Sequence, residues 1–367
     1  MKVLVVVGTR PEAIKMAPVV LRLRAEPGFE TVVCATAQHR DLLDSALALF
    51  GIAPDVDLDL MRPNQTPSAV AAGVLSAFDA VLEKAAPDVV LVQGDTTTVM
   101  AASLACFHRG VRVGHVEAGL RTANLRNPFP EEMNRRVTDL VSSLHFAPTA
   151  RSASALAAEG VDPESVHVTG NTVVDALRWL AERSPADEED ARDLVLVTSH
   201  RRESFGAPMR RSFRAIARLA RRFPETRFVF PVHPNPNVLE AARAFDGIGN
   251  VELLPPVDYA RLVSWMRRAK IILTDSGGIQ EEAPTFGKPT LVLRETTERP
   301  EGIEAGVAKL VGTDEETIYR EAERLLSDPD ALAAMSRAAN PYGDGRAAER
   351  IVAVLAGRPI APFSARA

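Results

Sequence analysis

Residues 3–19 read VLVVVGTRPEAIKMAPV, an apolar run that breaks at Gly8 into a charged turn and then resumes with a helical pattern. The valine-rich run predicts a buried strand, and Pro11 is typical of the first turn of a helix. A strand that leads directly into a helix places Arg10 at the helix N-terminus, where an anion is favoured. We therefore interpret Arg10, with Lys15 about one turn further on, as a candidate phosphate site. The alternative is a polar turn whose charges are solvated.

The same alternation of apolar strands and helical segments continues along the chain. In the first half the predicted strands are residues 3–7, 31–36, 88–94, 111–118, 144–148 and 166–170. In the second half they are residues 194–200, 227–233, 251–255, 270–277, 289–295 and 308–312. Continuous apolar strands separated by helices are typical of parallel sheets covered on both faces. The predicted fold class is α/β, with two doubly wound, Rossmann-like domains.

The length of 367 residues also favours two domains over one core. Residues 181–193, AERSPADEEDARD, are acidic, contain a proline and carry no periodic apolar face, which predicts a linker. We place the first domain at residues 1–175 and the second at 176–346. The helical segment at about residues 347–367 is expected to pack back on the first domain.

The composition excludes several classes of protein. Basic and acidic residues number 43 and 48, are interleaved and give a net charge of −5, so no nucleic-acid partner is expected. No run approaches the ~20 apolar residues that cross a bilayer, and residues 3–7 are too short for a signal peptide. We expect a cytoplasmic protein with no membrane partner. Cys34 and Cys106 lie in apolar runs and are expected to be buried, free thiols.

Charged and polar residues gather where the predicted strands of the first half end. Asp95 follows one strand in QGDTTT, Glu117 follows the next in HVEAGLRT, and Glu131 and Glu132 begin a predicted helix in FPEEMNRR. Since the carboxyl ends of parallel strands meet at one edge, these acids are expected to converge there, where burial separates acid from base roles. Glu131 and Glu132 have a second interpretation, as charges that stabilise a helix N-terminus.

The second half ends its strands with His200, His233 and the turn Ser276-Gly277-Gly278. Glycines let the backbone approach a phosphate, and Glu282 could accept both hydroxyls of a ribose, although a helix start that favours acids explains it as well. No HExxH motif occurs, and the acids of DVDLDL at residues 55–60 are interpreted as the exposed face of a strand. No metal site is predicted.

A set of ordered motifs, spread over residues 1–354, closely resembles the non-hydrolysing UDP-N-acetylglucosamine 2-epimerases. They are GTRPEAIKMAP, QGDTTT, HVEAGLRT, PFPEEMNRR, TGNTVVDAL, SHRRESFG, DSGGIQEEAPTFGKP, TTERPE and NPYGDGRAAERI. The resemblance implies two Rossmann-like domains in a GT-B arrangement with an interdomain active-site cleft, a homodimer and no cofactor. It also implies reversible epimerisation at C2 of UDP-GlcNAc to UDP-ManNAc, by elimination of UDP to 2-acetamidoglucal and its re-addition.

The resemblance carries residue roles with it. Asp95, Glu117 and Glu131 match the family's catalytic acids, and His200 matches a nucleotide-sugar contact that we group with them. The nucleotide-sugar contacts also include Arg10, Lys15, Ser276, Gly277, Gly278, Glu282 and Arg299.

Some members bind a second, activating UDP-GlcNAc, in a pocket to which Gln38 and His233 correspond. Asp41 and Asn64 differ from the Gln and Arg of activated members, which leaves activation open. Ala37 and Ser199 replace family glycines. A UDP-sugar-dependent GT-B glycosyltransferase and a non-catalytic nucleotide-sugar sensor are the alternative functions.

Overall fold

The structure is a computed structural model that describes all residues except 37–39, 61, 63–64, 123, 184–191 and 366–367. The chain forms two compact units. The N-terminal unit comprises Met1–Ala176 and Gly343–Ser364, and the C-terminal unit is formed by Leu177–Tyr342. Each unit is built around one parallel sheet, and each is described by itself.

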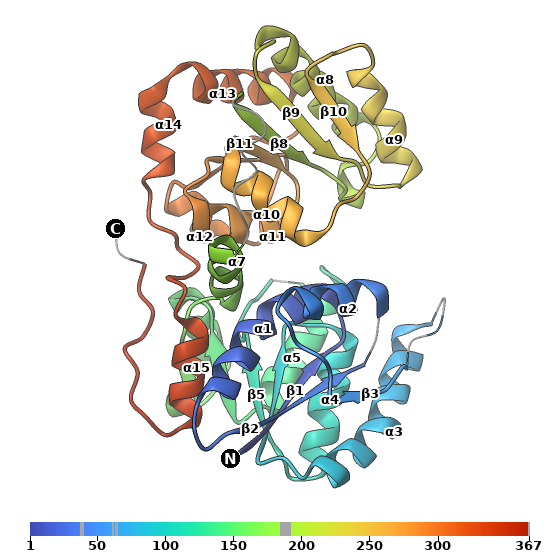
Figure 1. The fold of residues 1–367 in the computed structure, drawn as a ribbon, viewed down its shortest axis with the longest axis vertical. Coiled ribbons are helices and arrows are strands. Elements are labelled where there is room, and N and C mark those ends of the chain that lie inside the picture. The colour runs from blue at the N-terminus through green and yellow to red at the C-terminus, as the bar shows by residue number, and fades with distance from the viewer. Residues whose placement is uncertain (37–39, 61, 63–64, 123, 184–191, 366–367) are drawn as a thin grey trace. The chain divides into compact units, whose positions relative to one another are not determined.

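The sheet of the N-terminal unit has seven strands among the described residues, in the order β3-β2-β1-β4-β5-β6-β7, all paired in parallel (Figure 1). Its strands are β1 (Lys2–Val7), β2 (Glu30–Ala35), β3 (Val56–Asp57), β4 (Val89–Gln93), β5 (Arg112–Val116), β6 (Leu144–Ala147) and β7 (Val166–Val168). Val3–Val7 are fully buried, as expected for a central strand with helices on both faces.

Helices follow these strands along the chain. They are α1 (Arg10–Ala25), α2 (Arg40–Leu49), α3 (Pro67–Ala85), α4 (Thr97–His108), α5 (Glu131–Val141), α6 (Ala150–Ala158), η1 (Pro163–Ser165), α15 (Ala347–Leu355) and α7 (Thr172–Arg183), whose residues from Leu177 on belong to the C-terminal unit. Threonine caps four of them: Thr9, Thr66, Thr96 and Thr149 each accept a hydrogen bond from a backbone N–H of the first turn.

The C-terminal unit repeats the architecture with six strands among the described residues, in the order β10-β9-β8-β11-β12-β13. They are β8 (Leu194–Thr198), β9 (Arg227–Pro231), β10 (Val251–Leu254), β11 (Ala269–Thr274), β12 (Thr290–Val292) and β13 (Ala308–Leu310). The helices are η2 (Arg202–Ser204), α8 (Ala207–Arg222), α9 (Pro236–Ala242), η3 (Arg243–Phe245), α10 (Tyr259–Arg268), α11 (Gly277–Glu282), η4 (Ala283–Phe286), α12 (Pro300–Glu304), α13 (Glu315–Ser327) and α14 (Pro329–Ser336). The predicted class, two parallel α/β domains, is confirmed.

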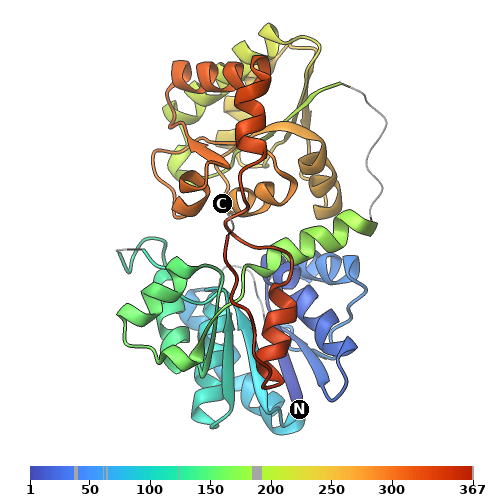
Figure 2. The same ribbon diagram turned by 90° about the vertical axis from the view of Figure 1, so that its left-hand side faces the viewer.

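The last helix, α15, packs against α1 inside the N-terminal unit, where Figure 2 shows the two side by side. The carboxylate of Asp175 on α7 caps it, accepting hydrogen bonds from the backbone N–H groups of Ala347 (3.2 Å) and Ala348 (2.9 Å). Burial of Asp175 raises its pKa to about 6. The segment that re-enters at Gly343 is therefore held by a buried acid at its helix start.

Three details differ from the sequence-based expectations or refine them. The first helix begins at Arg10 rather than after Pro11, since Thr9 is its cap. Helix α7 runs through Arg183, so residues 181–183 of the predicted linker are helical, and residues 184–191 of that linker lie outside the described part of the chain. The segment at 55–60 pairs with the sheet over Val56–Asp57 alone, although its acids are exposed as predicted.

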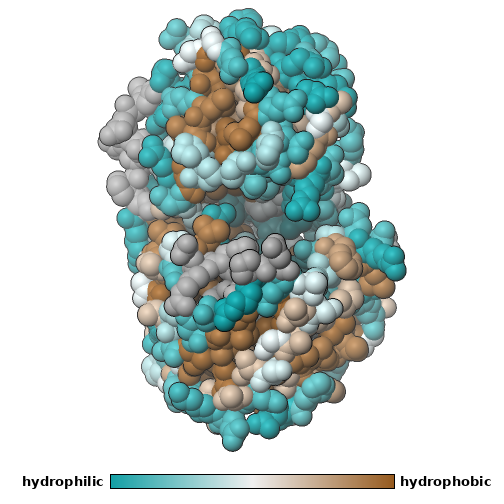
Figure 3. Space-filling view, turned by 90° about the vertical axis from the view of Figure 1, so that its right-hand side faces the viewer, coloured by the Kyte–Doolittle hydropathy of each residue, from teal (hydrophilic) through white to brown (hydrophobic). Residues whose placement is uncertain are grey.

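Both cysteines are buried and free, as predicted. Within the described residues, no helix combines the length and apolar character that a membrane span requires. Apolar side chains do reach the surface of the N-terminal unit, where Figure 3 shows a broad apolar area on one face. The most exposed large ones of this unit are Phe107 on α4, Phe129 before α5 and Leu140 on α5, at 61%, 69% and 82% exposure.

Candidate active site

The N-terminal unit brings the predicted acids to the carboxyl edge of its sheet. Asp95 follows β4, and Glu117 directly follows the neighbouring strand β5. Arg10 follows β1 on the other side of β4 at the same edge. The order β1-β4-β5 therefore gathers residues from distant parts of the sequence, as the parallel topology requires.

The carboxylate of Glu117 is buried and held by several donors. Nζ of Lys15 lies 2.5 Å from Oε1, and Nδ2 of Asn171 donates to the same oxygen at 3.0 Å. Nε2 of Gln93 donates to Oε2. The backbone of Glu117 has φ +67°, a left-handed conformation that costs energy for a residue other than glycine. Both oxygens are thus occupied, and the carboxylate has one orientation.

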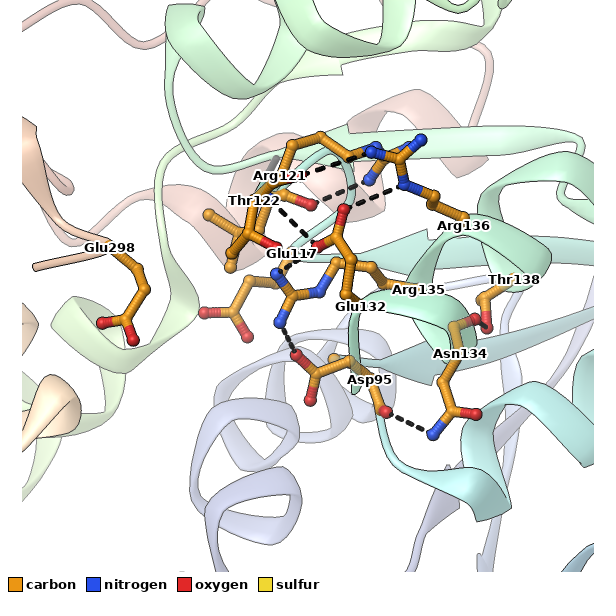
Figure 4. Close-up of polar contacts among 12 residues, drawn as sticks. Asp95, Glu117, Arg121, Thr122, Glu132, Asn134, Arg135, Arg136, Thr138 and Glu298 are labelled. Carbon is orange, nitrogen blue, oxygen red and sulfur yellow. Dashed lines mark hydrogen bonds and ion pairs between the residues drawn. The ribbon is translucent and has the colours of Figure 1, made fainter. Parts of the chain in front are cut away.

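Asp95 is held by helix α5. Nη2 of Arg135 lies 2.5 Å from Oδ2 of Asp95, and Nδ2 of Asn134 donates to its backbone oxygen at 2.9 Å (Figure 4). Arg135 also donates to the buried carboxylate of Glu132 at 3.1 Å. A charge-assisted contact of this kind fixes both the carboxylate and the guanidinium.

The neighbouring acids Glu131 and Glu132 have different surroundings. Glu132 is fully buried, pairs with Arg136 at 2.9 Å and accepts the backbone N–H of Thr122 at 3.0 Å, so it anchors the loop before α5 (Figure 4). Glu131 is half-buried at the first position of α5. Its carboxylate has no hydrogen-bond or ion-pair partner in the described part of the chain, which leaves it available to a substrate.

The turn after β1 leads into a half-buried arginine, Arg10, and a buried acid, Glu12. Arg10 is the first residue of α1, is half-buried, and has no ion pair with any described residue. Glu12 is 2% exposed and accepts the backbone N–H of Gly8 at 2.6 Å. Burial raises the pKa of Glu12 to about 7. Lys15, which the sequence predicts as a second phosphate contact, pairs with Glu117 in this structure, and the phosphate contact stays a prediction.

In the C-terminal unit, buried Asp275 organises the loop after β8. Its carboxylate accepts the hydroxyl of Ser199 at 2.8 Å and the backbone N–H groups of His200 and Arg201 at 3.0 Å. Ser199, which replaces a family glycine, therefore adds a hydrogen bond to this anchor. Asp275 follows β11, so the anchor joins the ends of two adjacent strands.

The same strand ends carry a concentration of positive charge. A Cβ at Gly277 would lie 3.1 Å from the Arg299 guanidinium carbon and 3.2 Å from Nη2 of Arg201, so both guanidiniums approach the backbone closely here and a larger residue would shift them. Arg299 is oriented by buried Glu281, whose Oε1 accepts from Nε at 2.8 Å. Ser276 precedes α11, and its hydroxyl makes no cap hydrogen bond to that helix.

The remaining predicted residues of this unit lie nearby in sequence and fold. Gly278 follows Gly277 in the first turn of α11, and Glu282 ends that helix half-buried. His200 stacks on His233 with ring centroids 5.9 Å apart, and both line a cavity of about 410 Å³. Burial, Arg201 and His233 lower the pKa of His200, although Asp275 opposes this. Gln38 lies outside the described residues, so the second UDP-GlcNAc pocket stays a prediction.

The sequence interpretation missed four residues that hold these groups: Gln93, Arg135, Asn171 and Arg201. Each lies inside a motif quoted above, namely QGDTTT, PFPEEMNRR, TGNTVVDAL and SHRRESFG. The signal was their place inside a quoted motif. The carboxylates that Gln93, Arg135 and Asn171 contact lie 24, 40 and 54 positions away in the chain. Across the described ranges, no cluster of three or more His, Cys, Asp or Glu side chains is placed to hold a metal ion.

Comparisons with known proteins identify the family of the chain. A family model described as UDP-N-acetylglucosamine 2-epimerase matches residues 21–356. The chain belongs to that family. A UDP-N-acetylglucosamine 2-epimerase of Yersinia pestis is 51% identical over 369 residues, covering 97% of this chain and 98% of the relative. The resemblance inferred from the motifs is therefore confirmed.

Solved structures of the epimerase family share the fold. The Neisseria meningitidis UDP-GlcNAc 2-epimerase bound to UDP-GlcNAc is 46% identical, with a TM-score of 0.90 over 98% of this chain and all of that one. The Methanocaldococcus jannaschii UDP-GlcNAc 2-epimerase in complex with UDP-GlcNAc and UDP is 31% identical, with a TM-score of 0.80 over 97% of this chain and all of that one.

Proposed function

We propose that this protein interconverts UDP-GlcNAc and UDP-ManNAc by epimerisation at C2, through elimination of UDP and its re-addition to 2-acetamidoglucal. Family membership supports the substrate, and relatives with that ligand bound support a nucleotide-sugar site. No cofactor is part of the proposal. The cytoplasmic location stays a prediction from the sequence.

The proposed reaction explains why acids and cations occur together. The C2 hydrogen is not adjacent to a carbonyl, so it becomes acidic only as the bond from C1 to the diphosphate oxygen breaks. A carboxylate takes the C2 proton, the C1=C2 bond forms, and UDP leaves with the electron pair of the C1–O bond. In the return step the diphosphate oxygen attacks C1 while a proton is delivered to the opposite face of C2. The overall change is an isomerisation.

Acid–base work is assigned to Asp95, Glu117 and Glu131 as a set. Glu117 is held by three donors and Asp95 by Arg135, so each carboxylate has a defined direction. Glu131 has no partner within the described residues and can contact a ligand. Two faces of a sugar ring need proton-transfer groups, which a set of three acids provides.

Stabilisation of the leaving diphosphate is assigned to cations and helix N-termini. In the C-terminal unit, Arg201 and Arg299 converge over Gly277 beside Ser276. In the N-terminal unit, Arg10 stands at the start of α1. Hydrogen-bond donors that already point at developing negative charge lower the barrier most, because they need no rearrangement during the reaction. Asp275 binds the backbone N–H of Arg201, and Glu281 binds Nε of Arg299, so both arginines are held in advance.

The observation that carries the proposal is the meeting of Asp95 and Glu117 at the ends of adjacent strands, each held by a cation. Proton NMR of the protein with UDP-GlcNAc in deuterated water tests it. We expect both epimers to appear with deuterium at C2, because the abstracted proton exchanges with solvent. An epimer that keeps its original C2 hydrogen contradicts the elimination mechanism, and free ManNAc with UDP, or no reaction, contradicts the proposed activity.

The resemblance also implies a homodimer, which we propose forms through the N-terminal unit. The support is the exposure of Phe107, Phe129 and Leu140 on or beside the adjacent helices α4 and α5, since large exposed apolar side chains mark interfaces. Light scattering of the purified chain should give twice the chain mass, and Leu140→Glu should give the monomer. Leu239→Glu on α9, where the leucine is 51% exposed, is the matched control and should stay dimeric. A monomeric wild type contradicts this assignment.

A further inference from the structure

A histidine that the proposed mechanism does not use lies directly beneath the two acid-bearing loops. His115 is in β5, two residues before Glu117, and its side chain is completely buried. Its Nδ1 lies 2.5 Å from Oδ1 of Asp139 on α5. Its Nε2 lies 2.7 Å from the backbone oxygen of Gly94, the residue before Asp95.

Both partners of the ring can act only as acceptors. A backbone carbonyl has no proton to donate. The Asp139 carboxylate also accepts from Nη2 of Arg121 at 2.8 Å and from the backbone N–H of Gly119 at 3.3 Å, contacts that favour its ionised form. A neutral imidazole has one N–H group, so one of its two short contacts would set a nitrogen lone pair against an oxygen. A doubly protonated ring satisfies both.

The charges around the ring agree with a cation. Burial by itself lowers the pKa of His115, but the Asp139 carboxylate, the Gly94 carbonyl and the charge of Asp95 outweigh it and raise the pKa above its ordinary value. Burial raises the pKa of Asp139, yet His115 and Arg121 hold it below its ordinary value.

Besides Asp95, in the turn after β4, the other charged and titratable groups around this pair lie on three elements. His145 on the neighbouring strand β6 binds the backbone oxygen of Asp139 through Nε2 at 2.9 Å. Arg121, in the loop after β5, is shared with Glu159 next to α6. Two cations, His115 and Arg121, thus contact the single carboxylate of Asp139. The charge of Arg121 is also paired with the carboxylate of Glu159.

This ion pair touches the backbone beside each acid. His115 holds the carbonyl of Gly94, which has φ +81° and precedes Asp95. Asp139 holds the N–H of Gly119, two residues after the left-handed Glu117. A contact that ties both turns to α5 restricts the separation of the two carboxylates.

We propose that His115 is a permanently charged imidazolium which, paired with Asp139, positions the turns that carry Asp95 and Glu117. It is a positioning residue, because its buried ring cannot reach a substrate. The catalytic part of this inference rests on the proposed epimerase function, whereas the charge state of the ring does not.

The charge state is tested by NMR of protein containing histidine labelled with ¹⁵N in the ring, with the signals of His115 assigned by their loss in His115→Gln. We expect both ring nitrogens to remain protonated from pH 6 to pH 8.5. A neutral tautomer at pH 7.5 overturns the proposal. Since no turnover is needed, an inactive protein with a charged ring would contradict the proposed function and leave the imidazolium standing.

The positioning role is tested by kinetics. Glutamine at position 115 can donate to Gly94 but carries no charge for Asp139, so kcat of His115→Gln should fall about 10- to 100-fold, the scale of a misplaced catalytic group. KM and the calorimetric affinity for UDP should change less than threefold. Asp139→Asn removes the carboxylate that pairs with His115, so it should likewise lower kcat while KM changes less than threefold.

His145→Gln is the matched control. His145 is a buried histidine on the adjacent strand, pairs in register with His115 and contacts Asp139 through its backbone, but it has no contact with Gly94. We expect His145→Gln to lower the melting temperature as much as His115→Gln and to keep kcat within threefold of wild type. If both variants lose kcat in proportion to stability, His115 is an ordinary core residue and the positioning role is wrong.

Discussion

The ammonium of Lys15 lies 2.5 Å from Oε1 of Glu117, although 102 positions separate them in the chain. Lys15 extends from the helix that follows β1, and Glu117 follows β5, so the ion pair crosses the end of β4, the strand between them. Asp95 follows β4, the strand between β1 and β5, and its own carboxylate pairs with Arg135. Because Glu117 and Asp95 have different cationic partners, the two acids can be substituted and tested one at a time.

Replacing an acid by its amide keeps its shape but removes its proton-transfer capacity. Asp95→Asn, Glu117→Gln and Glu131→Gln should each lower kcat by about 10²- to 10⁴-fold. The calorimetric affinity for UDP should remain within a few-fold of wild type, because UDP lacks the N-acetylhexosamine whose C2 proton the acids transfer. Near-normal turnover of Glu131→Gln would assign that residue to the helix start alone.

Arg10 has no ion-pair partner within the described residues, so its removal should affect a ligand more than the fold. Arg10→Ala should weaken UDP binding by about 1.5–3 kcal/mol, the range for a hydrogen bond to a charged group, and should lower kcat because the leaving diphosphate loses a partner. Titration calorimetry measures the first effect, and a thermal melt without ligand checks the fold. Unchanged affinity together with a lowered melting temperature would make the turn after β1 structural.

Gly277 sits where a methyl group would meet the guanidiniums of Arg201 and Arg299 at 3.1–3.2 Å. Since both are ends of flexible side chains, Gly277→Ala should displace them and weaken UDP binding about tenfold or more, a change of ~1.4 kcal/mol, while the unit stays folded. Gly249→Ala, in the same unit with no atom within 4 Å of the added carbon, is the control and should bind UDP normally. Equal affinities for the two variants would remove these guanidiniums from the phosphate site.

Glu12 predicts a pH-dependent stability. Burial raises its pKa from 4.5 to about 7, so the folded state holds the proton more tightly than the unfolded state. Its contribution to stability is complete below pH 4.5 and is lost as the pH rises to 7, by about 3 kcal/mol at most. Glu12→Gln lacks this loss, so its free energy of unfolding relative to wild type should be higher at pH 8 than at pH 5.

Urea unfolding at the two pH values measures that difference. Glu225→Gln, at an exposed acid with no ion pair to any described residue, should show no such change between pH 5 and pH 8. If the difference between Glu12→Gln and wild type is the same at both pH values, Glu12 titrates in the folded protein as it does in the unfolded chain.

The predictions that succeeded from sequence depended on local patterns. The apolar runs at residues 3–7 and 194–200 gave β1 and β8 to within two residues, because a strand buried on both faces must be apolar throughout. The acids Asp95 and Glu117 could be placed at strand ends for the same reason, since each ends such a run. Their roles in catalysis remain predictions.

The partners of those acids could not be predicted in this way. The position of Lys15 near Arg10 predicts a phosphate contact, which stays a prediction, but it does not show that the sheet order also brings Lys15 to Glu117. Asn171, in the loop between β7 and α7, and Gln93, at the end of β4, reach the same carboxylate, and no spacing in the sequence relates them. The boundary of the predicted linker was also displaced, because α7 continues to Arg183 despite its polar sequence.

By itself, then, the sequence determined the parallel α/β class, the family and the residue types at the strand ends. These features depend on short apolar runs and on the order of motifs, which can be recognised without knowing which distant residues meet. Only the tertiary structure decided which charges meet: Lys15 with Glu117, Arg135 with Asp95, and His115 with Asp139. His115 shows the reason most clearly. A histidine inside an apolar strand looks like core packing, and its charge becomes evident only when α5 and the turn after β4 place two acceptors against its ring.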